Sequence, residues 1–182
     1  MDVLDFPKET KPREIFAYTC ERMAEPLIPL GFKYRKSKND IVKTDRRFQY
    51  AIWFQPSIKF GSANFSVHVL VTSDELAAWR KRNGVENATD VVLGETLAAL
   101  THRAQEWPQY CVQTLAERER VIAEVTQQIH EFALPFFDRF QNLDDLVKDV
   151  SARGFLPHRK LGNRLHRKKD DEFCQCFAGD PA

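Results

Sequence analysis

Two stretches near the middle of the chain alternate between apolar and polar residues with a period of two. These are Phe48–Ser57 and Asn64–Ser73. The large apolar positions are Phe48, Tyr50, Ile52 and Phe54 in the first and Phe65, Val67, Val69 and Val71 in the second. Such alternation is typical of strands with one face in a core. A short loop containing Gly61 joins them, so the sequence predicts an antiparallel hairpin at the centre of the fold.

Before the hairpin, apolar residues recur at the three- and four-residue steps of an amphipathic helix. This helix is expected to begin near Thr10, with Pro12 early, where its missing N–H costs nothing. Pro26 should end or kink it, and Gly31 should close the segment in a left-handed conformation. Short strands or a hairpin are then expected over Phe32–Lys36 and Asp40–Thr44.

After the hairpin, the pattern predicts mostly helices. Ser73 is the expected N-cap of a short helix, and Asn142 that of another, which should end before Gly154. The longest predicted helix is Leu115–Leu134, stopped by Pro135. The stretch 88–104 mixes strand-favouring and helix-favouring residues, and we favour a helix after Gly94.

These elements predict an α+β fold: a single domain over residues 10–156, with a three- to four-stranded antiparallel sheet packed against helices. Residues 157–182 are expected to form a basic, mobile C-terminal tail, because the apolar periodicity stops after Leu156. The predicted core consists of Phe16, Met23, Leu27, Phe32, Ile52, Phe54, Val67, Val69, Ile122, Val125, Ile129 and Phe132.

Composition supports an ordered globular protein, since 43% of the 182 residues are hydrophobic and fourteen are phenylalanine. The segment Met1–Lys11 lacks the apolar stretch of a secretory signal, and no run is long enough to span a bilayer. We therefore expect no membrane association. Four cysteines without an export signal favour free thiols and a cytoplasmic location.

Charge is distributed unevenly along the chain, although the net charge is only +1. Seven basic residues and no acidic ones lie between Arg153 and Lys169, so the rest of the chain is net negative. Clustered Lys and Arg gain affinity for phosphates by releasing counterions. The candidate nucleic-acid contacts are Arg159, Lys160, Arg164, Arg167, Lys168 and Lys169.

A second candidate site is the sheet face opposite the core positions. If the apolar set points inward, the other phase of the strands forms one partly open surface. A Trp among amides, cations and an imidazole is typical of a surface that binds a partner or ligand. The candidate binding residues are Lys33, Arg35, Gln49, Trp53, Gln55 and His68. The competing interpretation is that a helix covers Trp53 and that the polar groups are simply solvated.

Motifs for catalysis, cofactors or metals are absent from the sequence. It has no glycine-rich phosphate loop, no Gly-x-Ser-x-Gly elbow and no His-Glu-x-x-His. His158, His166, Cys174 and Cys176 have the chemistry of zinc ligands, but Cys-x-Cys is a poor spacing for a zinc knuckle. We therefore assign no catalytic residue, no cofactor and no metal, and leave enzymatic activity open while favouring a non-catalytic protein.

The order of several motifs resembles a bacterial family known only as domain of unknown function 4304. The motifs are Pro26–Lys33, Ile52–Ser57, Phe65–Val69, Trp107 and Phe132–Phe137, and the resemblance covers Tyr18–Ser151. It implies an α+β fold with an antiparallel sheet and helices, and it implies no catalytic residues.

The sequence leaves two classes of function open for this protein. The first is a non-catalytic protein-binding or regulatory module of the immunity type, which would use the Trp53 face or the acidic body. The second is a nucleic-acid-associated protein that uses the Lys33/Arg35 face and the basic tail. The oligomeric state is open in both.

Overall fold

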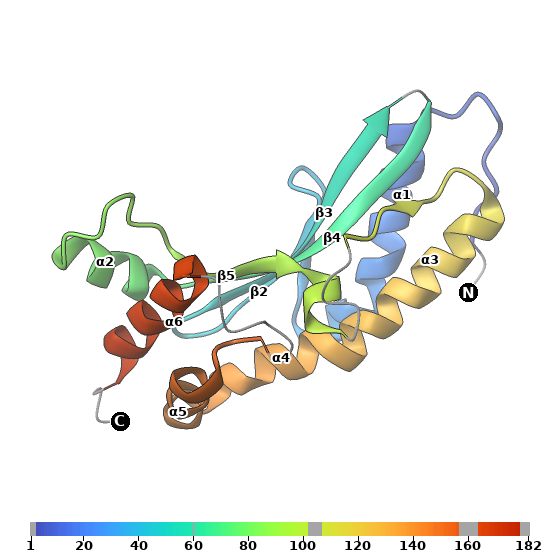
Figure 1. The fold of residues 1–182 in the computed structure, drawn as a ribbon. Helices are drawn as coiled ribbons and strands as arrows, with labels where there is room; N and C mark the ends of the chain where they lie inside the picture. Colours follow the sequence, from blue (N-terminus) through green and yellow to red (C-terminus); the bar gives the residue numbers. More distant parts are fainter. Residues whose placement is uncertain (1–2, 60, 102–106, 157–163, 179–182) are drawn as a thin grey trace.

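The central hairpin is present in the structure, a computed structural model that describes residues 3–59, 61–101, 107–156 and 164–178 (Figure 1). Strands β3 (Gln49–Lys59) and β4 (Ser62–Thr72) pair in antiparallel register over their whole length. Gly61 between them has a φ of 80°, a left-handed conformation that glycine adopts without steric cost.

Further strands extend the hairpin into one antiparallel sheet. The strand order is β1-β2-β3-β4-β5, and β6 pairs with the other end of β4. The added strands are β1 (Lys33–Arg35), β2 (Asp40–Thr44), β5 (Val91–Thr96) and β6 (Tyr110–Cys111). The α+β fold with an antiparallel sheet is confirmed, and the sheet has six strands rather than three to four.

Helices cover one face of this sheet, which we call the inner face (Figure 1). Helix α1 packs against β3 and β4, and α3 packs beside α1. The helical elements on this side are α1 (Pro12–Ala24), η1 (Glu25–Leu30), η2 (Leu97–Leu100), α3 (Leu115–Gln128), η3 (Ile129–Ala133), α4 (Leu134–Asp138) and η4 (Arg139–Gln141). Helices α2 (Asp74–Arg82), α5 (Leu143–Arg153) and α6 (Arg164–Phe177) lie toward the β2–β5 end.

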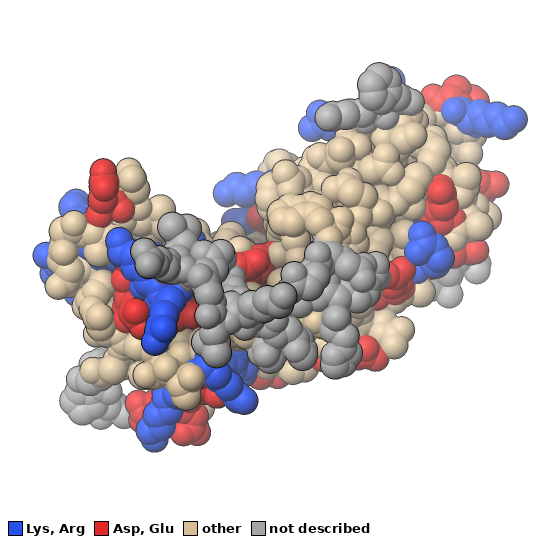
Figure 2. All heavy atoms as spheres, viewed as in Figure 1, with Lys and Arg blue, Asp and Glu red and all other residues tan. Residues whose placement is uncertain are grey.

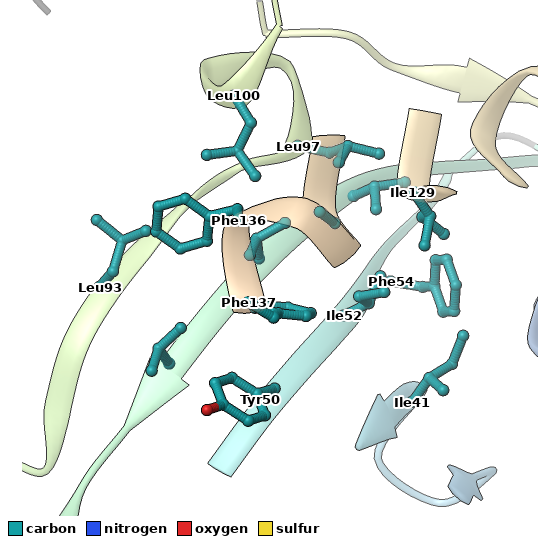
Figure 3. Close-up of a cluster of buried hydrophobic side chains, with 14 of the residues drawn as sticks. Ile41, Tyr50, Ile52, Phe54, Leu93, Leu97, Leu100, Ile129, Phe136 and Phe137 are labelled. Carbon is teal, nitrogen blue, oxygen red and sulfur yellow. The ribbon is translucent and has the colours of Figure 1, made fainter. Parts of the chain in front are cut away.

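The core lies between the inner face and these helices (Figure 3). Ile52 and Phe54 of β3 face Ile129 and Phe137 of the helical layer. Ten of the predicted core residues are buried, and the other two, Ile122 and Phe132, are half-buried and pack against the core. The strand register inferred from the alternating pattern is therefore correct, because a one-residue slip would have exchanged the two faces.

Several predicted helix boundaries are confirmed. Helix α1 ends before Pro26, and Gly31 closes the following 3₁₀ segment with a φ of 88°. The side chains of Ser73 and Asn142 each accept a hydrogen bond from a backbone N–H in the first turn of α2 and α5. Gly154 follows α5.

Pro135 does not stop the long helix as predicted. The chain stays helical through α4, with Pro135 in that helix's first positions, where no N–H is needed. A π-helical turn, η3, precedes it. The wider π turn shifts the backbone just before the proline ring, at the place where the ring would clash with a regular α-helix.

The expected helix after Gly94 is instead strand followed by 3₁₀ helix. Val91–Thr96 forms β5, and only Leu97–Leu100 is helical. Pairing with β4 determines the outcome, because Leu93 lies opposite Val71 and enters the core. Tertiary context thus outweighs the local helix propensity of the alanines.

The chain after Leu156 differs from the expected mobile tail over the part that the structure describes. Helix α6 packs against α5 and α2 and buries Phe173 and Phe177. Phe173 contacts Phe155 with ring centroids 4.8 Å apart, so α6 completes the aromatic core at this end. Residues 157–163 and 179–182 lie outside the described part. Among the described helices, none is long and apolar enough to cross a membrane.

Candidate functional site

The face opposite the helices, called here the outer face, carries one row of polar and aromatic side chains across five strands. The strand registers place Arg35 opposite Asp40, Asp40 opposite Trp53, Trp53 opposite His68, and His68 opposite Thr96. Directly opposed residues share a sheet face and have adjacent side chains. The row therefore brings together groups from β1 to β5.

The six predicted binding residues all belong to the outer face by register, but they are not all adjacent. Arg35, Trp53 and His68 lie in the row itself, and Gln55 lies one pair further along, opposite Ser66. Lys33 is exposed at the β1 margin. Gln49 is four residues from Trp53 along β3, or about 13 Å, and belongs to the far end of the sheet.

Three rings form a cluster at the middle of the outer face: Trp53, His68 and Trp107. The Trp53 and His68 ring centroids are 5.2 Å apart, and those of His68 and Trp107 are 5.4 Å apart. The two tryptophans are 38% and 64% exposed. We call Trp53, His68 and Trp107 the aromatic cluster. Its exposure shows that the described structure does not bury Trp53 under a helix.

Trp107 was not among the predicted site residues. It precedes β6 in an irregular segment, so no periodicity assigns its side chain to a face. Because β6 pairs with β4 on the side away from β3, Trp107 reaches His68 from the direction opposite to Trp53. The signal available in the sequence was the family resemblance, which includes Trp107 among its motifs.

His68 is held in place by a neighbour on its own strand. Its Nε2 lies 3.0 Å from the Ser66 hydroxyl, and the same hydroxyl donates to Gln55 at 3.5 Å. Burial lowers the pKa of His68, and the negative charge of Glu95 partly offsets this shift. Ser and His side chains can also form the nucleophile–base pair of an enzyme. Here Ser66 is only 2% exposed, so the contact orients the imidazole and does not present a nucleophile to a substrate.

Arg35 forms a two-pronged ion pair with Asp40. Its Nε donates to one carboxylate oxygen at 2.7 Å and its Nη2 to the other at 2.5 Å. The hydrogen bond to Asp40 raises the pKa of Arg35. Paired donors of this kind satisfy the carboxylate and cancel its charge. Arg35 therefore supports the outer face structurally and adds little positive charge to it.

The visible surface over the middle of the hairpin carries little charge. Figure 2, drawn from the side on which β4 lies in front of α1, shows a broad area over β3 and β4 without Lys, Arg, Asp or Glu in its visible part. Charged side chains lie at its margins. Exposed aromatic surface with a polar margin is the composition of a contact site.

Two hollows lie away from the outer face. The larger has a volume of about 770 Å³ and is lined by residues of both charges, including Arg46, Arg47, Asp45 and Asp144. The smaller, of about 240 Å³, lies beside Leu30 and Tyr50. The larger one favours no single ligand charge, and we regard the aromatic cluster as the better candidate. Within the described residues, no group of three or more His, Cys, Asp or Glu could hold a metal.

The predicted nucleic-acid contacts are only partly described. Arg159 and Lys160 lie outside the described residues, and Arg164 begins α6. Arg167 and Lys168 are exposed on α6, whereas Lys169 is half-buried. Two aspartates and Glu172 follow directly in the same helix, so the basic run ends against acidic residues.

A family model described as "Domain of unknown function (DUF4304)" matches residues 23–139. The chain belongs to this family. The matched range includes all six strands and Trp53, His68 and Trp107, and it ends before α5 and α6. No curated protein and no solved structure matches the chain.

Proposed function

We propose that this DUF4304 protein is a binding module whose outer sheet face, centred on the aromatic cluster, docks another protein. The single observation that supports this most directly is the exposure of two tryptophans, from separate parts of the chain, against one half-buried imidazole. Trp is among the residues most enriched at the energetic centres of protein interfaces. A regulatory or immunity-type role is consistent with such a surface.

The setting of the cluster supports a preformed contact site. Hydrogen bonding to Ser66 fixes His68, and the Arg35–Asp40 pair fixes the neighbouring strands. A rigid aromatic surface loses little conformational entropy on binding. The cysteines are all free thiols, which supports the proposed cytoplasmic location.

Affinity purification from the source cells tests the proposal. Tagged wild-type protein would be compared with Trp53→Ala and Trp107→Ala, with Ile58→Ala as a control for loss of an exposed apolar side chain elsewhere. We expect one protein to co-purify stoichiometrically with the wild type and Ile58→Ala, to be retained at high salt, and to be lost from both tryptophan variants. Retention by variants with unchanged melting temperature would contradict the proposal.

A nucleic-acid role is the second candidate, and its support is weaker. The rings are of the type that stacks on bases, and Lys33, Arg167 and Lys168 are exposed. Against it, Arg35 is paired with Asp40, and no Lys or Arg is visible over the middle of the hairpin in Figure 2. Phosphate contacts lose affinity steeply as salt rises, whereas apolar interfaces do not, so the high-salt wash separates the two candidates.

A further inference from the structure

We infer that the partner segment docked on the aromatic cluster is an extended, proline-rich peptide in the polyproline II conformation. This inference rests on the proposed function and names the chemistry of its partner. Aromatic-lined surfaces bind such peptides because the polyproline II helix is already ordered before binding. Four features of the cluster support this class of ligand.

The first feature is the inclination of the rings. Trp53 is tilted by 40° from His68, and Trp107 by 65°. The three rings therefore share no common plane, and one flat ligand cannot stack on all of them at once. The compact pyrrolidine ring of proline can instead pack against each inclined ring separately.

The second feature is the spacing of the tryptophans. They approach His68 from opposite sides of β4, in steps of 5.2 and 5.4 Å between ring centroids. The two indole centroids are therefore at most 10.6 Å apart, and the rise of about 9 Å for one three-residue turn of polyproline II lies within this limit. Prolines three residues apart would contact Trp53 and Trp107 in turn.

The third feature is the pair of indole N–H groups. Neither Trp53 nor Trp107 donates a side-chain hydrogen bond to any residue in the described ranges. A polyproline II chain makes no internal hydrogen bonds, so all its carbonyl oxygens can accept. Two unused donors beside an apolar surface match a ligand that is rich in acceptors and, where proline occurs, lacks donors.

The fourth feature is the charge around the cluster, where the negative Glu95 acts on His68. No Lys, Arg, Asp or Glu side chain is visible over the hairpin in Figure 2, and the nearby Arg35 is paired with Asp40. A phosphate-bearing ligand would gain little from such a surface. An uncharged proline-rich segment requires no counter-charge.

Isothermal titration of the full chain with a decaproline peptide tests the inference, with a Gly-Ser peptide of equal length as the control ligand. We expect the wild type to bind decaproline and not the Gly-Ser peptide. Trp53→Ala and Trp107→Ala should each weaken binding at least tenfold, while Ile58→Ala should bind as the wild type. Circular dichroism would establish that each variant is folded. If Trp53→Ala does not fold, Trp53→Phe replaces it, since phenylalanine keeps a ring but removes the indole donor.

The inference would be overturned if the wild type did not bind decaproline, or if both folded tryptophan variants bound it as tightly as the wild type does. Binding of oligothymidylate or of a neutral oligosaccharide in place of decaproline would also overturn it. Failure of this inference is distinguishable from failure of the proposed function. A protein that co-purifies with the wild type and is lost from Trp53→Ala would leave the docking surface standing even if decaproline does not bind.

Discussion

Arg80 and Glu172, 92 residues apart in the sequence, form a buried ion pair that joins α2 to α6. The Arg80 Nε donates to a Glu172 carboxylate oxygen at 2.8 Å, and the two side chains are 4% and 12% exposed. The Nη1 of Arg80 also donates to the backbone carbonyls of Thr89 and Val91, at 2.9 and 2.7 Å. One guanidinium thus ties together a helix, the start of β5 and the last described helix.

Removal of Glu172 should destabilise the protein strongly. Glu172→Ala leaves the Arg80 charge buried without its carboxylate, and breaking such a pair costs about 3–5 kcal/mol. Urea unfolding followed by circular dichroism would measure the loss. Asp171→Ala, which removes an exposed carboxylate from the same helix, is the matched control and should change the free energy of unfolding little. Equal effects from the two substitutions would show that the pair is not structurally important.

Helix α6 is expected to be part of the cooperative fold. Phe173 is fully buried against Phe155 and Phe177, so Phe173→Ala should cost about 3–5 kcal/mol, through lost apolar burial and the cavity left behind. Arg167→Ala, on the exposed side of α6, should be nearly neutral. The comparison uses urea midpoints with unchanged slope. A chain unaffected by Phe173→Ala would restore the interpretation of a mobile tail.

The register of the central hairpin predicts that a new carboxylate will have opposite effects on stability at its two faces. Val67 is 3% exposed on the inner face, so Val67→Asp buries an unpaired charge and should unfold the domain, since the cost is comparable to total stability. Gln55→Asp introduces the same carboxylate on the exposed outer face and should leave the fold intact. Soluble expression and circular dichroism distinguish the outcomes. A folded Val67→Asp protein would mean that the inner face is misassigned.

The outer face could be predicted from the sequence because a period of two allows only two assignments of each strand. Once Ile52 and Val67 are placed inward, Trp53 and His68 must lie outward and opposite each other. The fold class follows from the same pattern. The extra strands were harder to predict, because β6 has two residues and β5 depends on pairing with β4.

The structural features that the sequence did not predict depend on contacts between residues that are distant in the chain. Trp107 reaches His68 from an irregular segment, and Asp40 meets Arg35 across a turn. In the sequence of α6, a run of charged residues precedes the two buried phenylalanines. The apolar periodicity of a helix is therefore difficult to recognise there. Local propensity carries no information on such contacts.

The last prediction concerns the pH dependence of stability at His68. Burial lowers the pKa of His68 in the folded protein below its ordinary value of 6.5. Above the unfolded-state pKa, the imidazole is neutral in both states and the folded protein has its full stability. As the pH falls through 6.5, the unfolded chain binds a proton that the folded chain does not, so unfolding becomes more favourable. The loss ends once the pH is below the folded-state pKa.

His68→Gln separates this contribution from those of the other histidines. Between about pH 7.5 and pH 5.5, the wild type should lose more stability than His68→Gln, which has no proton to bind at this position but retains a polar side chain beside Ser66. Melting temperatures measured across this range for the two proteins give the difference directly. Parallel pH profiles, or a steeper loss in His68→Gln, would mean that the folded protein binds a proton at His68 at least as readily as the unfolded chain, which would contradict the lowered pKa.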